Sequence, residues 1–191
     1  MDVWRERDLS GTAYRFLFLD GANFQVRRGR TVERLRFLCV VGARARDGGM
    51  EVLAIEVGDR EQKTLWAALF QTLARRGLDM TAVELGIMDG LPGLEAAFRA
   101  AYPSAVQIIE RDLESLLRFY RWEPSYWHSL RTTDPIERVN KEFKRRTKAM
   151  GITGRELTTY RLLAYVALTM NLAWRSYALS TPRHFYTLKA A

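Results

Sequence analysis

Three acidic residues stand where they could act together on one substrate. Asp20 and Asp89 each end a short apolar run that predicts a β-strand, and Glu137 lies in the first turn of a helix predicted to begin at Asp134. If the two strands are neighbours in a sheet, their ends bring both aspartates to one edge. Glu137 lies at the border of the helix face expected to pack on the sheet, so it could approach the same point.

Three carboxylates that meet at one point need a counter-charge, because in a low dielectric they repel one another. Two oxygen-ligated Mg²⁺ ions about 3.5–4 Å apart would supply it, and such a pair stabilises the attacking and leaving oxygens of a phosphodiester displacement. Each residue also has an ordinary interpretation. Asp before Gly is typical of a turn, and a first-turn Glu complements the helix dipole. Spacing alone leaves both interpretations open.

The residue types exclude several other metal centres. The sequence contains one cysteine, Cys39, and two histidines, His128 and His184. An internal disulfide, a Cys-cluster zinc site and a His-rich site are therefore excluded. The ligands of any bound metal would be mostly oxygens, which favours Mg²⁺ or Mn²⁺.

A strongly basic segment surrounds Glu137. Residues 131–148 carry seven basic and three acidic side chains. A charge run is usually a solvated helix face, but Lys141 and Lys144 share the side of the helix that carries Glu137, so we expect a phosphate-binding surface. Asn140 has two candidate roles: it could contact a phosphate, or it could orient a metal ligand. The side chains predicted to contact DNA are Arg131, Arg138, Asn140, Lys141, Lys144, Arg145, Arg146 and Lys148.

The composition favours one folded domain with a nucleic-acid partner. The chain has 191 residues, of which 48% are hydrophobic, and a formal net charge of +8. This charge favours a polyanion, and residues 110–191 hold fifteen basic and eight acidic side chains, which is most of the excess. No apolar run approaches the roughly 18 residues of a membrane span, and the N-terminus has no apolar signal-peptide core. We therefore expect a cytoplasmic protein with no membrane partner.

Hydrophobic periodicity predicts an α/β fold in a single domain over residues 1–191. Residues 1–109 are mainly strands with one or two helices, and residues 110–191 are helical and basic. The first three strands are expected to form an antiparallel meander, and the last helix, apolar almost all round, to be buried on the sheet. The predicted strands cover residues 14–20, 35–42, 50–57, 82–90 and 105–109. The predicted helices cover residues 61–77, 94–102, 112–122, 134–148 and 157–179.

Several ordered blocks resemble a known family. Residues 131–148 resemble the R-T-T-N-x-I-E-R-x-N-x-x-x-K-R-R-T-K signature of Mutator-type bacterial insertion-sequence transposases. Residues 18–27 resemble that family's hLDAxYxKVR block, and residues 66–77 its W-x-x-x-L-x-x-L-x-x-R-G-L segment. Residues 88–91 resemble the block around its second catalytic Asp. The resemblance extends over roughly residues 4–175, and the order of its blocks makes it specific.

The resemblance implies a DDE-type catalytic core with an RNase H-like fold, here with a mixed five-stranded sheet. It assigns Asp20, Asp89 and Glu137 as the catalytic and metal-binding triad for two Mg²⁺ or Mn²⁺ ions. The implied function is DNA strand cleavage and strand transfer during transposition of an insertion sequence. The implied partners are the transposon ends, the target DNA and a second copy of the chain in a homodimer.

The sequence also departs from the family pattern. Fewer than twenty residues precede Asp20, and Gln107 runs directly into Ile108, where the family has a Cys-x-x-His element and then a helical insertion. We therefore expect the N-terminal DNA-binding region and the insertion to be missing. Two alternatives follow: a shortened, catalytically inactive DNA-binding relic, and a metal nuclease of the same fold that cuts without strand transfer.

Overall fold

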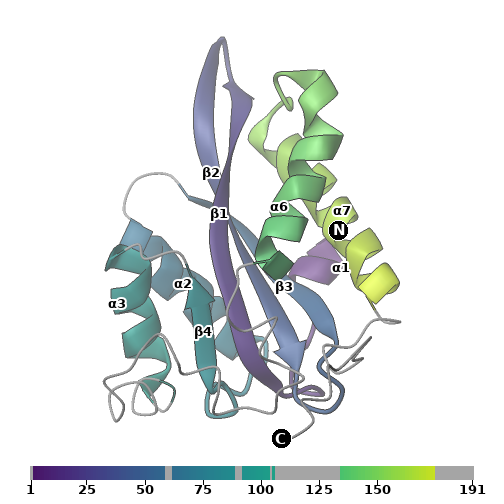
Figure 1. The fold of residues 1–191 in the computed structure, drawn as a ribbon. Helices are drawn as coiled ribbons and strands as arrows, with labels where there is room; N and C mark the ends of the chain where they lie inside the picture. The colour runs from purple at the N-terminus through teal and green to yellow at the C-terminus, as the bar shows by residue number, and fades with distance from the viewer. Residues whose placement is uncertain (1, 59–61, 89–91, 104, 106–133, 175–191) are drawn as a thin grey trace, which may run out of the picture.

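The computed structural model describes residues 2–58, 62–88, 92–103, 105 and 134–174 (Figure 1). This part of the chain contains four strands and several helices, and the predicted helix over 112–122 lies outside it. The strands are β1 (Tyr14–Arg28), β2 (Thr31–Arg44), β3 (Met50–Gly58) and β4 (Leu85–Met88). The helices are α1 (Asp2–Arg5), α2 (Gln62–Arg75), α3 (Pro92–Ala101), α6 (Asp134–Thr147), the 3₁₀ turn η2 (Lys148–Met150) and α7 (Glu156–Trp174).

The strands form one mixed sheet in the order β3-β2-β1-β4. The first three pair antiparallel, which confirms the predicted meander, and β4 lies parallel to β1. The last pair of the β1–β4 ladder joins Leu19 to Met88. The residues that follow these two in the chain are Asp20 and Asp89, so the register of the ladder bears directly on the predicted site.

The sheet of the described residues has four strands, not the predicted five. The fifth was predicted over residues 105–109, of which only Ala105 is described, and Ala105 is helical and fully buried. An apolar run of five residues has no periodicity that separates a strand from a buried helical segment. Ala105 packs in the same core cluster as residues of α2 and α3.

Asp20 was predicted to end the first strand, but it lies inside that strand. β1 continues to Arg28, and Gly21 remains paired with Leu38 of β2. The Asp-Gly pair forms no turn here. Gly21 instead allows close packing, because a Cβ at this position would collide with Nε of Arg36. The absence of a side chain at Gly21 therefore allows the side chain of Arg36 on β2 to pack against β1.

Helices cover both faces of the sheet, and each face has its own apolar core. Figure 1 shows α2 and α3 on one side and α6 and α7 on the other. Alternate residues of β1 point to opposite faces, so Phe16 and Phe18 pack toward α6 and α7, and Leu17 and Leu19 pack toward α2 and α3. Two layers of helices thus fix the position of β1 at the centre of the fold.

The described part of α7 is only partly buried, which corrects the prediction of a helix buried all round. Leu163, Ala164 and Ala167 are fully buried in the core, but Tyr165 is 60% exposed and Leu172 is 64% exposed. The helix packs on β3 and β1 with one face only, since no described element covers the other. No helix of the described residues is long and apolar enough to cross a membrane.

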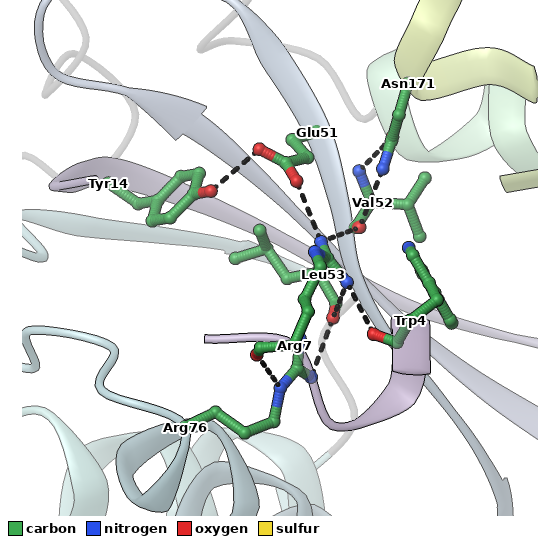
Figure 2. A network of polar contacts seen from close by, with 8 residues as sticks. All are labelled: Trp4, Arg7, Tyr14, Glu51, Val52, Leu53, Arg76 and Asn171. Atoms are coloured by element: carbon green, nitrogen blue, oxygen red, sulfur yellow. Dashed lines mark hydrogen bonds and ion pairs between the residues drawn. The ribbon is translucent and has the colours of Figure 1, made fainter. Parts of the chain in front are cut away.

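Side chains close the outer edge of β3. Asn171 of α7 accepts a hydrogen bond from the Val52 amide at 2.7 Å and donates one to the Val52 carbonyl at 3.2 Å (Figure 2). Arg7 donates to the same carbonyl at 2.7 Å, and Arg76 donates to the Leu53 carbonyl at 2.9 Å. An open edge strand presents unpaired amides and carbonyls that favour aggregation, so these contacts protect the sheet.

Candidate metal and nucleic-acid site

Two donors among the described residues hold Asp20 in place. Its side chain is 20% exposed. Oδ1 accepts the Gly21 amide at 2.6 Å, and Oδ2 accepts Nδ2 of Asn140 at 2.5 Å. A carboxylate that accepts such hydrogen bonds is oriented as well as stabilised, so the side chain of Asp20 is fixed between the sheet and α6.

Arg36 of β2 is the cation nearest to Asp20 for which a contact is described. Its Nη2 lies 4.0 Å from Oδ1 of Asp20, and its chain passes over Gly21. Nε of Arg36 is buried and has no hydrogen-bond partner in the described part of the chain. Sequence analysis did not single out Arg36. Only the strand register of the β1–β2 hairpin places Arg36 near Asp20, and the apolar runs did not show how long this hairpin is.

Burial of its apolar face orients α6 against the sheet. Ile136, Val139 and Phe143 are at most 1% exposed and lie in the core cluster of that face. Asn140 follows Val139 and is itself 7% exposed, which explains its contact with Asp20. Glu137 lies one helical turn earlier, about 4.5 Å along the axis, and its side chain is exposed. The helix therefore carries Glu137 to the region of Asp20.

The third predicted carboxylate, Asp89, lies outside the described residues. Met88, which precedes it, pairs with Leu19, which precedes Asp20. Among the described residues no group of three or more His, Cys, Asp or Glu side chains could hold a metal ion. Two of the three predicted ligands, Asp20 and Glu137, are thus placed, and the triad as a whole stays a prediction.

Cys39 lies opposite Asp20 in the β1–β2 register and takes no part in this chemistry. The thiol is buried, and burial raises its pKa well above the ordinary value, with a smaller contribution from the charge of Asp20. A protonated thiol is a poor nucleophile and a poor metal ligand.

A basic groove begins beside the Asp20–Asn140 contact. It has a volume of about 570 Å³ and runs between β1 and the C-terminal half of α6. Asn23 and Gln25 of β1 line one side. The basic residues that line the groove are Lys141, Lys144, Arg145 and Lys148. Their side chains are exposed, and such a row offers a phosphate backbone several contacts.

Glu142 partly balances the basic side chains of this helix. Glu142 accepts hydrogen bonds from Arg145 at 2.6 and 2.7 Å and from Arg146 at 2.9 Å. The hydrogen bond from Arg145, followed by that from Arg146, lowers the pKa of Glu142 to about 2. Glu142 is therefore ionised at neutral pH and reduces the local positive charge.

The other residues predicted to contact DNA differ in exposure. Arg138 and Arg146 are exposed on α6. Arg131 lies outside the described residues. Asn140 is buried against Asp20, so its side chain fits the orientation of a ligand, the second role expected of it, better than contact with a phosphate.

A model of the Mutator family of transposases matches residues 1–108 and 100–176. The chain belongs to this family. Among curated relatives, a transposase for insertion sequence element IS6120 of Mycolicibacterium smegmatis is 32% identical over 201 residues, which cover 74% of this chain and 61% of that protein. A transposase for IS905 of Lactococcus lactis is 27% identical, and the match covers 76% of this chain and 51% of that protein. The chain thus spans about half to three fifths of the length of these two relatives.

The oxygens around Asp20 in this Mutator-family chain suit a hard divalent cation. Carboxylate and amide oxygens are ligands that Mg²⁺ and Mn²⁺ prefer. Oδ1 of Asn140 is buried and has no hydrogen-bond partner in the part of the chain that the structure describes. A buried polar atom of this kind commonly marks an ion or water. Asp20 and Glu137 are the described side chains that could hold such an ion.

Proposed function

We propose that this chain is the catalytic core of a DDE-type insertion-sequence transposase. Water would cleave a DNA strand at the transposon end and leave a 3′-hydroxyl. That hydroxyl would then attack a phosphodiester of the target, forming one phosphodiester bond as another breaks. The observation that carries the proposal is the hydrogen bond from Asn140 to Asp20, because it ties the helix of Glu137 to the strand of Asp20.

Asp20, Asp89 and Glu137 are the proposed ligands of two Mg²⁺ or Mn²⁺ ions. Asp20 would contact both ions, Asp89 one and Glu137 the other. When bound, the ions would supply positive charge to the attacking and leaving oxygens of the phosphodiester. Asn140 keeps Asp20 in one orientation, and Arg36 contributes a nearby positive charge.

The DNA backbone is the proposed occupant of the basic groove. Lys141 follows Asn140 directly, and the row continues through Lys144 to Lys148 along α6. A strand whose phosphates contact these lysines would pass beside Asp20. We propose the transposon ends and the target as partners, a homodimer as the working unit and the cytoplasm as the location.

The proposal is tested with purified full chain, Mn²⁺ or Mg²⁺ and labelled DNA that carries the cognate element ends. We expect nicked and joined products from the wild type, and a loss of at least about a hundredfold for Asp20→Asn and Glu137→Gln. Asp79→Asn is the matched control, since Asp79 caps a loop at Thr81 away from α6.

The alternatives give different products. Salt-sensitive DNA binding without metal-dependent cleavage would identify the inactive relic, and cleavage without joined molecules would identify a nuclease. Equal activity of Asp20→Asn and the wild type would refute the catalytic assignment.

A further inference from the structure

The hairpin of β1 and β2 extends beyond the helices on one side. Figure 1 shows its distal half clear of α2 and α3, while α6 and α7 still flank the other side. The strands remain paired up to Arg28 and Thr31. Gly29, with φ of 61°, allows the tight turn between them. The result is a two-stranded ribbon with one face covered and one face free of the described helices.

Side-chain alternation gives the two faces of this ribbon opposite character. Ala22, Phe24 and Val26 are at most 6% exposed and pack in the core under α6 and α7. The residues between them are exposed. The same alternation that buries one face of the ribbon in the core exposes the other face to solvent.

The outward face carries amides and guanidinium groups. Asn23 is paired across the strands with Arg36, Gln25 with Arg34, and Arg27 with Val32. Directly paired residues project to the same face. We define the ribbon face as Asn23, Gln25, Arg27, Arg34 and Arg36.

Arg36 lies 4.0 Å from Asp20, but among the residues that the structure describes no acid pairs with the other two arginines of the ribbon face. Glu33 is paired with Val26, so it belongs to the opposite face, where it lies 3.5 Å from Arg28. Within the described ranges, the side chains of Arg27 and Arg34 make no hydrogen bond or ion pair. These arginines are consequently available to an external anion.

We propose that the ribbon face enters the major groove of duplex DNA. That groove admits a two-stranded β-ribbon, and Arg, Asn and Gln are the side chains that hydrogen-bond base edges there. Residues two apart on a strand are about 6.8 Å apart, which equals two base steps of about 3.4 Å each. Asn23, Gln25 and Arg27 can therefore reach the edge of every second base along the groove, and the excess positive charge complements DNA.

Asn23 and Gln25 also line the basic groove, although their side chains project to the face opposite α6. The ribbon face and the groove therefore meet along the edge of β1 that β4 does not cover. A duplex could place its backbone along Lys141 and Lys144 while the ribbon contacts its bases. The inference rests on the proposed function in taking DNA as the ligand. It adds a surface that selects sequence, where α6 supplies contacts that are independent of sequence.

The test compares matched charge removals in the full chain. Binding of a labelled 40-base-pair duplex carrying the element's own end is measured by fluorescence anisotropy over a range of salt concentrations. The ribbon variant is Arg27→Gln with Arg34→Gln. The control is Arg75→Gln with Arg161→Gln, two exposed arginines on α2 and α7. Thermal melting checks that each variant folds, and Arg34→Gln alone is the second ribbon variant.

We expect the ribbon variant to weaken binding by about tenfold or more relative to the control. Its salt slope should change no more than that of the control, since the slope reports phosphate contacts and the ribbon contacts base edges. Replacing guanine by 7-deazaguanine, which removes the N7 acceptor that arginine uses in the major groove, should weaken binding by the wild type but not by the ribbon variant.

Equal losses in the ribbon variant and the control, or wild-type binding by the ribbon variant, would overturn the inference. If the wild type still binds and nicks DNA in that case, the proposed function stands and only the ribbon contact fails. No DNA binding by the wild type would refute both.

Discussion

Nδ2 of Asn140 donates a hydrogen bond of 2.5 Å to Oδ2 of Asp20, although the two residues are 120 positions apart in the chain. The bond joins the centre of the sheet to α6, the most basic helix described. This hydrogen bond explains why Asn140, an uncharged residue, occurs among the lysines and arginines of α6. Asn140 belongs to the inner face, and the cations belong to the outer one.

Removal of the Asn140 amide should affect both stability and chemistry. Asn140→Ala leaves the half-buried Asp20 carboxylate without one of its described hydrogen-bond donors. We expect the free energy of unfolding to fall by about 1–3 kcal/mol, and metal-dependent nicking to fall about 10–100-fold. Urea unfolding and a nicking assay measure the two effects. Arg138→Ala, on the exposed side of the same helix, should change stability by less than about 0.5 kcal/mol.

Gly21 and Arg36 should be energetically coupled. Gly21→Ala alone pushes a Cβ into Arg36, and overpacking of this kind costs about 1–3 kcal/mol. With Arg36→Ala the clash is gone, and alanine is favoured over glycine in a strand by roughly 0.5–1 kcal/mol. A double-mutant cycle by chemical denaturation should therefore show Gly21→Ala changing sign. Equal effects in both backgrounds would contradict the close packing.

Loss of Glu142 should strengthen DNA binding and weaken the fold. Because the pKa of Glu142 is lowered to about 2 from 4.5, the folded state binds the proton less tightly than the unfolded state. The stabilisation is therefore complete above pH 4.5 and is lost as pH falls through about 2. Glu142→Gln should cost up to about 1 kcal/mol at pH 7 and almost nothing below pH 2.

The same variant frees Arg145 and Arg146, so its affinity for duplex DNA should rise severalfold at low salt. Glu95→Gln is the matched control, since Glu95 pairs with Arg99 on α3 in the same helical spacing. An equal gain in affinity from Glu95→Gln would show that only net charge matters.

Asn171 should stabilise the edge of the sheet. Asn171→Ala removes the partner of both backbone groups of Val52, although Arg7 still donates to the carbonyl. The amide is the group left without a partner, and the expected cost is about 1–3 kcal/mol. Asn171→Asp keeps the acceptor and should lose less. Faster hydrogen exchange at the Val52 amide in Asn171→Ala, but not in Asn171→Asp, would support this order.

Local pattern was sufficient to predict most of the elements. The apolar runs around Phe18, Val40 and Val52 predicted three antiparallel strands, and the spacing of Ile136, Val139 and Phe143 predicted α6. These patterns work because each element buries one face. The length of the β1–β2 hairpin was not predicted. Asp20-Gly21 is typical of a turn, and this signal outweighed the weaker alternation of apolar and polar residues over 22–26.

The site depends on contacts that no local pattern contains. Asn140 was singled out by its distance from Glu137 along the helix, but its partner Asp20 is fixed by tertiary packing. Arg36 has no local signal, because its role depends on a missing side chain at Gly21 and on strand register. The exposure of Tyr165 on α7 likewise follows from which elements pack around the helix, not from its composition.

The central claim is that Asp20, Asp89 and Glu137 gather around divalent cations. Crystals of the full chain soaked in MnCl₂ test it most directly, through anomalous difference density measured on the wild type and on Asp20→Asn. We predict density for two ions between the three carboxylates in the wild type, and its loss in Asp20→Asn. Carboxylates that lie far apart, or the same density with and without Asp20, would contradict the claim.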